Sequence, residues 1–310
     1  MIDASVIMAV KNNKINYLEQ SIESILNQTL NNFEFIIIAD GSNIETLKIL
    51  NYYEKKDSRI ILVTQKINKG LAYSLNIAIK KSKSKYLVRQ DYDDISIPER
   101  LAVLLKFFKK KNIAVCGSAV YKINNKNSII GKLQRKLSVN NHKKKLEFLN
   151  TLSHSSVIMN KEIIIKIGLY NEKLECSQDY DLWQRVVAFY DIASVPEYLV
   201  KLRIHESSVS SILEKQQRHY SFYIGLKHRF PKYTEIIEKY INVEPIFFLS
   251  KISHINDSKF TNYIHARLYV FLYDKINLFR FFRFNLKIIY NIIRIYFNRP
   301  TYLVKRLINF

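Results

Sequence analysis

The chain has 310 residues, 48% hydrophobic and 25% charged, a balance typical of a folded globular protein that excludes a disordered or collagen-like chain. Its formal net charge of +22 at pH 7 predicts a polyanionic neighbour: nucleic acid, an anionic membrane surface or a phosphorylated substrate. The two cysteines, Cys116 and Cys176, exclude a disulfide framework and a cysteine-based zinc finger, which favours a reducing, cytoplasmic location.

Apolar runs of strand length alternate with stretches of helical periodicity along the first part of the chain. The expected strands are 5–10, 33–39, 60–63, 86–89 and 113–116, and the expected helices are 18–26, 45–53, 71–79 and 98–108. Strands and helices that alternate at this interval predict an α/β fold with a doubly wound, mainly parallel sheet and helices on both faces.

The remaining segments carry weaker signals. Residues 120–150 are rich in Lys and Asn and weakly periodic, which predicts an extended excursion or a mobile loop. Long amphipathic stretches without strand or turn signals begin near residue 212, so we expect an α/β domain over 1–210 and a helical C-terminal segment over 211–310. We expect neither a signal peptide before the first strand nor a spanning helix, because no segment reaches about 18 uncharged apolar residues.

Polar and acidic residues follow the expected strands. They are Lys11–Asn13, Asp40–Ser42, Asn68–Gly70 and Asp91–Asp94. In an open parallel sheet, ligands bind beyond the carboxyl ends of the strands. The sequence therefore places its reactive groups where such a fold opens its binding site.

The acidic cluster Asp91, Asp93 and Asp94 directly follows an apolar strand. Three carboxylates this close repel each other, and a hard divalent cation shared with substrate phosphates would relieve the repulsion. The alternative is an ordinary solvated surface turn.

A second constellation runs from Gln178 to Trp183, the only tryptophan of the chain. The apolar spacing predicts that a helix starts here with Asp179 in its first turn. A carboxylate held there would suit a catalytic base, and the alternative is a helix-capping carboxylate. Two histidines, His154 and His205, lie next to strand-like runs, where a structural hydrogen bond competes with a functional role.

Together these segments resemble the family 2 glycosyltransferases of the GT-A fold, bacterial surface-polysaccharide type. The resemblance covers about residues 5–210 and rests on the ordered segments 5–8, 17–19, 21–29, 33–38, 40–42, 68–70, 75–76, 91–95 with Pro98 and 100–101, 168–172, 179–183 and 203–206. No single segment is specific, whereas their order and spacing are.

The resemblance implies an inverting transfer of a hexosyl or N-acetylhexosaminyl group from a nucleoside diphosphate sugar, UDP-linked in our interpretation, to a glycan acceptor. The process would be O-antigen, capsule or other surface-glycan assembly, with Mn²⁺ or Mg²⁺ as cofactor. The implied donor-binding residues are Ala9, Val10, Lys11, Asp40, Asn68, Gly70, Asp91 and Asp93. The implied metal ligands are Asp93, Asp94 and His205, the implied base is Asp179, and the implied acceptor contacts are Gln178 and Trp183.

Two positions depart from the family pattern. Ala39 stands where relatives often carry the Asp that contacts the nucleobase, and Gln178 stands where they often carry Glu before the base. The first leaves the identity of the nucleotide open, and the second the contacts to the acceptor.

The C-terminal segment is the basic end of the chain. Residues 261–310 hold nine Lys or Arg and one acidic residue, interleaved with aromatic side chains. This mixture predicts helices that lie on an anionic membrane surface, which would make a cytoplasmic enzyme peripheral to the inner membrane and bring it to a lipid-linked glycan acceptor. The alternative is that the apolar faces pack on the catalytic domain.

Other functional classes are less well supported. A non-enzymatic basic module for membranes or nucleic acid would leave the ordered acidic motifs unexplained, since carboxylates repel polyphosphate backbones, and we expect no nucleic-acid partner. A dinucleotide enzyme or a nucleotidyltransferase would need a glycine-rich phosphate-binding motif that the chain lacks.

Overall fold

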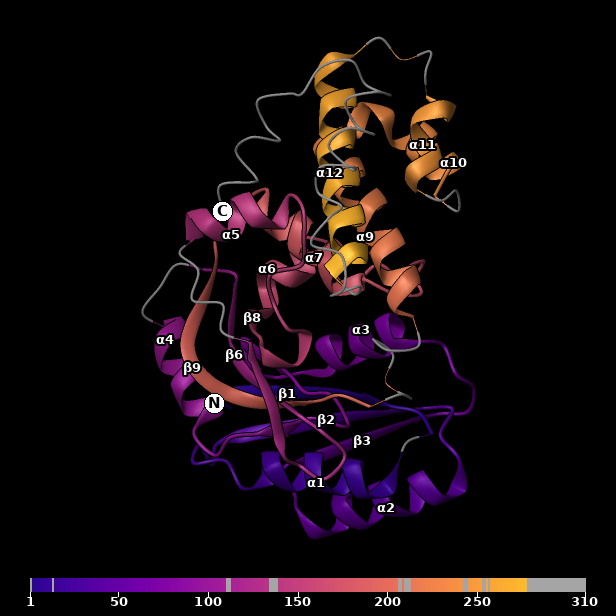
Figure 1. The fold of residues 1–310 in the computed structure, drawn as a ribbon. Helices are drawn as coiled ribbons and strands as arrows, with labels where there is room; N and C mark the ends of the chain where they lie inside the picture. Colours follow the sequence, from indigo (N-terminus) through magenta and orange to yellow (C-terminus); the bar gives the residue numbers. More distant parts are fainter. Residues whose placement is uncertain are drawn as a thin grey trace. The chain divides into compact units, whose positions relative to one another are not determined.

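The computed structural model describes residues 2–12, 14–109, 113–133, 139–205, 208, 213–241, 245–252, 255 and 257–277. The chain divides into two compact units, Met1–Gln217 and Arg218–Phe310 (Figure 1). The predicted boundary near residue 210 falls within 209–212, outside the described residues.

The first half of the sheet follows the predicted alternation of strands and helices. Its elements are β1 (Ala4–Val10), α1 (Ile15–Leu26), β2 (Phe33–Asp40), α2 (Ile44–Lys56), β3 (Ile60–Gln65), α3 (Leu71–Lys81) and β4 (Tyr86–Arg89). Strands β3, β2, β1 and β4 are neighbours in that order and all parallel, so their carboxyl ends share one edge of the sheet. Figure 1 shows α1 and α2 on one face of these strands and α3 on the other, which confirms the predicted doubly wound arrangement.

The second half of the sheet mixes strand directions. Its elements are β5 (Ile95–Ser96), α4 (Arg100–Lys109), β6 (Val115–Ile123), β7 (Ile129–Leu133), α5 (Val139–Leu146), η1 (His154–Ser156), β8 (Ile158–Asn160), α6 (Lys161–Lys166), α7 (Gln178–Val187) and β9 (Ile192–Arg203). Strand β8 is antiparallel to both β4 and β6, and β9 is parallel to β6 and antiparallel to β5. The pairing of β9 with β5 brings the end of β9 next to the segment that follows β4.

Residues 120–150, expected to form an extended excursion or a mobile loop, contain regular strands and a helix over much of their described part. Strand β6 continues to Ile123, turns at Asn124–Asn127 and pairs with β7, and α5 follows. Strand β7 lies at an edge of the sheet and is largely exposed. An edge strand held mainly by backbone hydrogen bonds needs no apolar pattern, which is why the sequence showed none.

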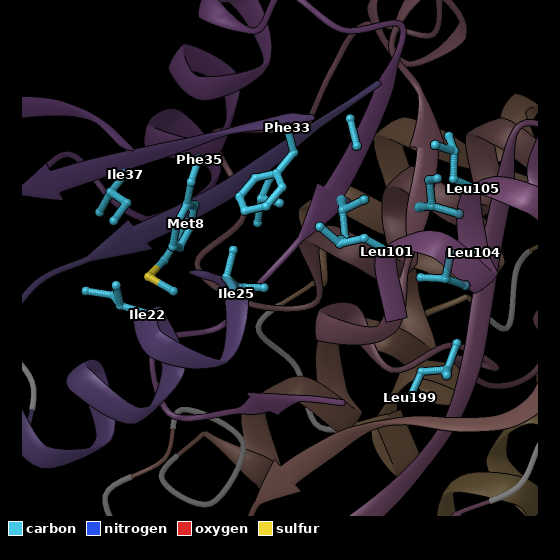
Figure 2. Close-up of a cluster of buried hydrophobic side chains, with 14 of the residues drawn as sticks. Met8, Ile22, Ile25, Phe33, Phe35, Ile37, Leu101, Leu104, Leu105 and Leu199 are labelled. Atoms are coloured by element: carbon cyan, nitrogen blue, oxygen red, sulfur yellow. The ribbon is translucent and has the colours of Figure 1, made fainter. Parts of the chain in front are cut away.

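The core beneath the sheet fastens α1 to the strands. Met8, Phe35 and Ile37 point toward Ile22 and Ile25 of α1, and all five side chains are almost completely buried (Figure 2). Burying each such side chain stabilises the fold by about 1.5–3 kcal/mol. Helix α1 is therefore a rigid support for the polar residues that it carries toward the end of β4.

The second unit is helical in its described part. The chain enters it within α9 (Glu214–Arg229), followed by η2 (Pro231–Tyr233), α10 (Thr234–Lys239), α11 (Pro245–Lys251) and α12 (Ser258–Asn277). None of the helices among the described residues is long and apolar enough to cross a membrane.

One basic residue of the predicted membrane surface lies inside this unit. Arg267 of α12 is 3% exposed and donates a hydrogen bond to the Ser221 carbonyl. Its guanidinium lies against Gly225, where an added Cβ would come within 2.1 Å of Nη1. The prediction that Arg267 faces lipid is corrected, because its guanidinium is buried and hydrogen-bonded inside this unit. The prediction for residues 278–310 lies outside the described residues.

Candidate active site

The turns after β1 and β2 are tied together at the carboxyl edge of the sheet. The Ser42 hydroxyl donates to the Val10 carbonyl at 3.1 Å. Of the predicted donor-binding residues in the first turn, Ala9 is half-buried, Val10 is buried and Lys11 is exposed. Ala9 and Val10 can therefore offer only backbone groups, whereas Lys11 can offer a cation.

Asp40 at the end of β2 organises the turn that precedes α3. Its carboxylate accepts hydrogen bonds from Asn68 Nδ2 (2.8 Å), Lys69 N (2.8 Å) and Gly70 N (2.9 Å), and its side chain is buried. The turns touch, since a Cβ on Gly41 would lie 2.5 Å from Asn68 N. The structure thus brings Asp40, Asn68 and Gly70 together, and the Asp40 carboxylate holds the other two in place.

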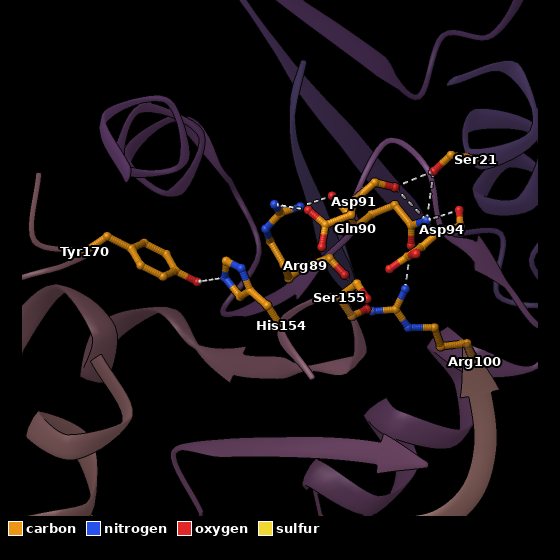
Figure 3. Close-up of polar contacts among 9 residues, drawn as sticks. All are labelled: Ser21, Arg89, Gln90, Asp91, Asp94, Arg100, His154, Ser155 and Tyr170. Atoms are coloured by element: carbon orange, nitrogen blue, oxygen red, sulfur yellow. Dashed lines mark hydrogen bonds and ion pairs between the residues drawn. The ribbon is translucent and has the colours of Figure 1, made fainter. Parts of the chain in front are cut away.

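Asp91, the first carboxylate after β4, is paired with a buried arginine. Arg89 is 0% exposed, its Nη2 contacts the Asp91 carboxylate, and its Nη1 donates to the Gln90 carbonyl (Figure 3). The Asp91 side chain is 30% exposed. The arginine therefore neutralises Asp91 from the protein side and leaves the other side of the carboxylate open.

Gln90 and Arg100 form a buried network behind the acidic cluster. Gln90 Nε2 donates to Ser21 Oγ and to the Asp94 carbonyl, both at 2.8 Å, and Gln90 Oε1 accepts from Arg100 Nη1 at 2.6 Å. Because a buried polar side chain is costly unless satisfied, this network fixes the path of residues 91–94. Sequence reasoning assigned no role to Arg89, Gln90 or Arg100. For Arg89 the signal available was a charged residue at the end of an apolar strand.

Arg203 at the end of β9 holds the same loop from the opposite side. Its backbone N–H donates to Asp94 Oδ1, and its Nε donates to the Asp93 carbonyl, each at 2.9 Å. The guanidinium also lies 4.2 Å from the centre of the Tyr17 ring. The Asp94 carboxylate is thus buried, and its hydrogen bond to the Arg203 backbone ties the loop 91–94 to the end of β9.

Asp93 lies against His205, with Oδ2 2.9 Å from Nε2. Burial and the charge of Asp91 raise the pKa of Asp93 to about 7. Burial lowers the pKa of His205, and the nearby cations Lys14 and Arg203 lower it further. Both groups are therefore pushed toward their uncharged forms, and a cation beside Asp93 would reverse this for the carboxylate.

The predicted metal ligands do not form a ready-made three-residue site. Over the described part of the chain, no group of three or more His, Cys, Asp or Glu side chains is placed to hold a metal ion. Asp93 and Asp91 nevertheless fit a hard divalent cation, because both offer carboxylate oxygens, the Asp91 side chain is partly exposed, and the charge of Asp91 acts on Asp93.

Asp179 lies in the first turn of α7, as predicted. Its Oδ2 accepts from Asn150 Nδ2 at 2.6 Å, and its Oδ1 accepts from Tyr180 N at 2.8 Å. The residue is half-buried, so part of the carboxylate stays accessible. Two neutral donors thus hold an acceptor-only group whose remaining lone pairs can take up a proton.

Of the two predicted acceptor contacts, Trp183 is completely buried and Gln178 is almost so. Trp183 is 0% exposed and packs edge-on to His154, with ring centres 6.4 Å apart. Its assignment to acceptor binding is therefore corrected: the indole anchors α7 in the core. Gln178 is 8% exposed, and its Nε2 donates to the Leu174 carbonyl, which leaves its Oε1 as the group able to reach a ligand.

His154 lies between the acidic cluster and α7. Its Nε2 is 2.8 Å from the Tyr170 hydroxyl, and Figure 3 shows the imidazole between Tyr170 and the Arg89–Asp91 pair. Burial, together with the Arg89 cation, lowers the pKa of His154 to about 4, and the charges of Asp179 and Asp91 act against this shift. Both predicted functional carboxylates are therefore within electrostatic reach of one imidazole.

Comparisons with known proteins agree on one family. Residues 5–168 match the model of Glycosyl transferase family 2. An uncharacterized glycosyltransferase of Methanocaldococcus jannaschii is 34% identical over 274 residues, which cover 82% of this chain and 94% of that protein. The O-antigen biosynthesis glycosyltransferase WbnJ of Escherichia coli is 35% identical over 213 residues, which cover 66% of this chain and 80% of WbnJ.

Solved structures share the fold at low sequence identity. S. aureus TarS in complex with UDP-GlcNAc has a TM-score of 0.61 at 14% identity, covering 87% of this chain and 80% of that one. The mannosyltransferase PcManGT of Pyrobaculum calidifontis in complex with GDP-Man and Mn²⁺ has a TM-score of 0.58 at 13% identity, covering 89% and 82%. The likeness supports the GT-A type of fold for this chain.

Proposed function

From the premise that this chain belongs to glycosyl transferase family 2, we propose that it transfers a hexosyl or N-acetylhexosaminyl group from a UDP-linked sugar to a glycan hydroxyl, with inversion at the anomeric carbon. The names of its relatives support a role in surface-glycan assembly, since WbnJ acts in O-antigen biosynthesis. The UDP-GlcNAc complex of TarS supports the donor class.

The donor would lie along the carboxyl edge of β1, β2 and β4. In the proposal, backbone groups at Ala9 and Val10 face the nucleoside, Lys11 offers positive charge to the phosphates, and Asn68 and Gly70 line the opposite side. Asp40 holds that side in shape through its three hydrogen bonds. A carboxylate committed in this way positions the site instead of reading the nucleobase.

A divalent cation, Mg²⁺ or Mn²⁺, would be held by the carboxylates of Asp93 and Asp91. His205 lies beside Asp93 Oδ2. When bound, such a cation compensates the charge that develops on the leaving diphosphate. Asp94, bonded inward to Arg203, would keep the loop in position for that ion. The buried Arg89 supports the same purpose, because its guanidinium holds the Asp91 carboxylate in place from the protein side.

Asp179 would accept the proton of the attacking hydroxyl. Inversion needs a single displacement, in which one base on the acceptor side faces a leaving group stabilised on the donor side. The observation that carries this proposal is that the charges of Asp91, at the end of β4, and Asp179, in α7, both act on the buried His154. These two carboxylates come from elements that are far apart in the sequence, and the fold brings each within electrostatic range of one side chain.

The experiment that tests the proposal measures donor binding and turnover on the same protein. Nucleoside diphosphates and their sugars are screened for thermal stabilisation with and without Mn²⁺, because a ligand of the native state raises its apparent stability. We expect the largest metal-dependent rise in Tm with UDP compounds. We also expect the enzyme to hydrolyse its preferred sugar donor slowly and release UDP. No stabilisation by any nucleotide, with or without metal, would overturn the proposal.

A further inference from the structure

The proposed base is held by a residue that the sequence did not single out. Asn150 donates from Nδ2 to Asp179 Oδ2 at 2.6 Å, and both residues are half-buried. The other carboxylate oxygen accepts the backbone N–H of Tyr180, which belongs to the same helix as Asp179. Asn150 is therefore the hydrogen-bond partner that fixes the Asp179 side chain from outside its own helix.

The segment that carries Asn150 is itself anchored from two sides. The buried His142 of α5 contacts Thr151 Oγ1 at 2.9 Å through Nδ1 and Ser194 Oγ of β9 at 3.1 Å through Nε2. On the α7 side, the Tyr180 hydroxyl donates to the Leu146 carbonyl at 2.6 Å. These contacts hold the chain on either side of Asn150, so its amide meets Asp179 from a fixed direction.

The same segment continues to the donor side of the site. His154 follows Asn150 by four residues and contacts Tyr170, and the carbonyl of the next residue, Ser155, accepts a hydrogen bond from Arg100. Arg100 is the buried arginine that supports the acidic cluster after β4. Residues 150–155 therefore contact both the residue proposed as base and the scaffold of the donor motif.

We propose that Asn150 is a positioning residue for the transfer reaction, which aims the Asp179 carboxylate at the acceptor hydroxyl. The inference rests on the proposed function, in which Asp179 is the base. A carboxylate with one oxygen bonded from outside keeps a single orientation, and a base must lie within hydrogen-bond reach of the proton that it removes. Held through Oδ1 by the Tyr180 N–H alone, the carboxylate would spend more of its time aimed elsewhere.

The two ends of the Asn150 amide can be separated experimentally. Asn150 Oδ1 accepts the N–H of Leu152 at 3.2 Å and closes a local turn, while Nδ2 contacts Asp179. Asn150→Asp keeps the oxygen for Leu152 and replaces the donor Nδ2 that faces Asp179 with a carboxylate oxygen. Asn150→Ala removes the contacts to Asp179 and to Leu152, so the difference between the two variants gives the contribution of the local turn to kcat and Tm. Asn160→Asp is the matched control, because Asn160 caps α6 through its oxygen, which aspartate retains.

The kinetic test separates kcat from KM. We expect Asn150→Asp to lower kcat for transfer by about 10- to 100-fold, the cost of misplacing a reacting group, with the donor KM within about a factor of two. The control Asn160→Asp retains wild-type kcat. In the Asp179→Asn background, Asn150→Asp should lower kcat no further, because the base on which it acts is already absent. A normal kcat in Asn150→Asp, or a further loss in the double variant, would overturn the inference.

A stability measurement tests the contact without turnover. Two facing carboxylates repel, so we expect Asn150→Asp to lower Tm by roughly 2–4 °C and Asp179→Asn to restore it when the two are combined. Absence of this coupling would overturn the inference whatever the activity. A different outcome would be coupling between the two variants while the wild-type protein neither binds nor turns over any nucleotide sugar. That result would overturn the proposed function and retain the Asn150–Asp179 pair.

Discussion

Asp93 is the residue on which metal-dependent donor binding should depend most. Asp93→Asn removes the carboxylate whose pKa is raised to about 7 by burial and by Asp91. We predict that the Mn²⁺-dependent rise in Tm with UDP disappears and that turnover falls by about 100-fold or more, since the charge compensation at the leaving diphosphate is lost. The exposed Asp191→Asn serves as the control. Wild-type turnover in Asp93→Asn would remove Asp93 from the site.

Asp179 should separate binding from chemistry. Asp179→Asn keeps the shape of the side chain but cannot accept a proton, so we predict that transfer falls by about 100-fold or more while the UDP-induced rise in Tm stays at the wild-type value. Titration calorimetry with UDP and Mn²⁺ checks the second half of the prediction. A donor affinity that falls as far as turnover does would mean that Asp179 acts mainly in binding.

The turn between β2 and α2 is expected to be the least tolerant element of the donor site. Gly41 has φ +65°, and a Cβ there would lie 2.5 Å from the backbone N of Asn68. Gly41→Ala should therefore cost about 1–3 kcal/mol of stability and displace the turn that Asp40 holds. Chemical denaturation measures the first effect and the UDP-induced shift in Tm the second.

Gly131 on β7 supplies the matched control for that substitution. Its φ is not in the left-handed region, and an added Cβ would come no closer than 3.7 Å to Lys122. We expect Gly131→Ala to leave both stability and donor binding close to wild type. Equal effects at Gly41 and Gly131 would show that the contact between the two turns is unimportant.

The whole chain carries a prediction about membranes. Eight Lys or Arg lie between Lys275 and Arg306, interleaved with aromatic residues, and we predict that the full-length protein cosediments with anionic vesicles and less so at high salt. The comparison is a shortened chain that ends at Asn277, where α12 ends, because a cut before α12 would remove the buried Phe260, Ile264 and Arg267. Equal cosedimentation of both chains, or no preference for anionic lipid, would mean that the tail does not bind membranes.

Much of the fold could be predicted from the sequence because its periodicity is local. The alternation from β1 to α4 and the acidic cluster after β4 follow from apolar spacing and from the rule that ligands bind at the carboxyl ends of strands. The first turn of α7 could be placed in the same way. These features depend on neighbours within a few residues, which the sequence displays directly.

The tertiary structure decided what lies against those features. The pairing of β9 with β5 brings Arg203 and His205 to the acidic cluster, and the segment before η1 brings Asn150 to Asp179. The burial of Trp183 and Arg267, which changed two interpretations, has the same origin. A hydrogen bond between residues 29 or 109 positions apart leaves no periodic trace in the chain, because it depends on where the sheet and its crossovers place the two side chains. The sequence by itself thus determined the elements and the chemical groups, and the tertiary structure determined their partners.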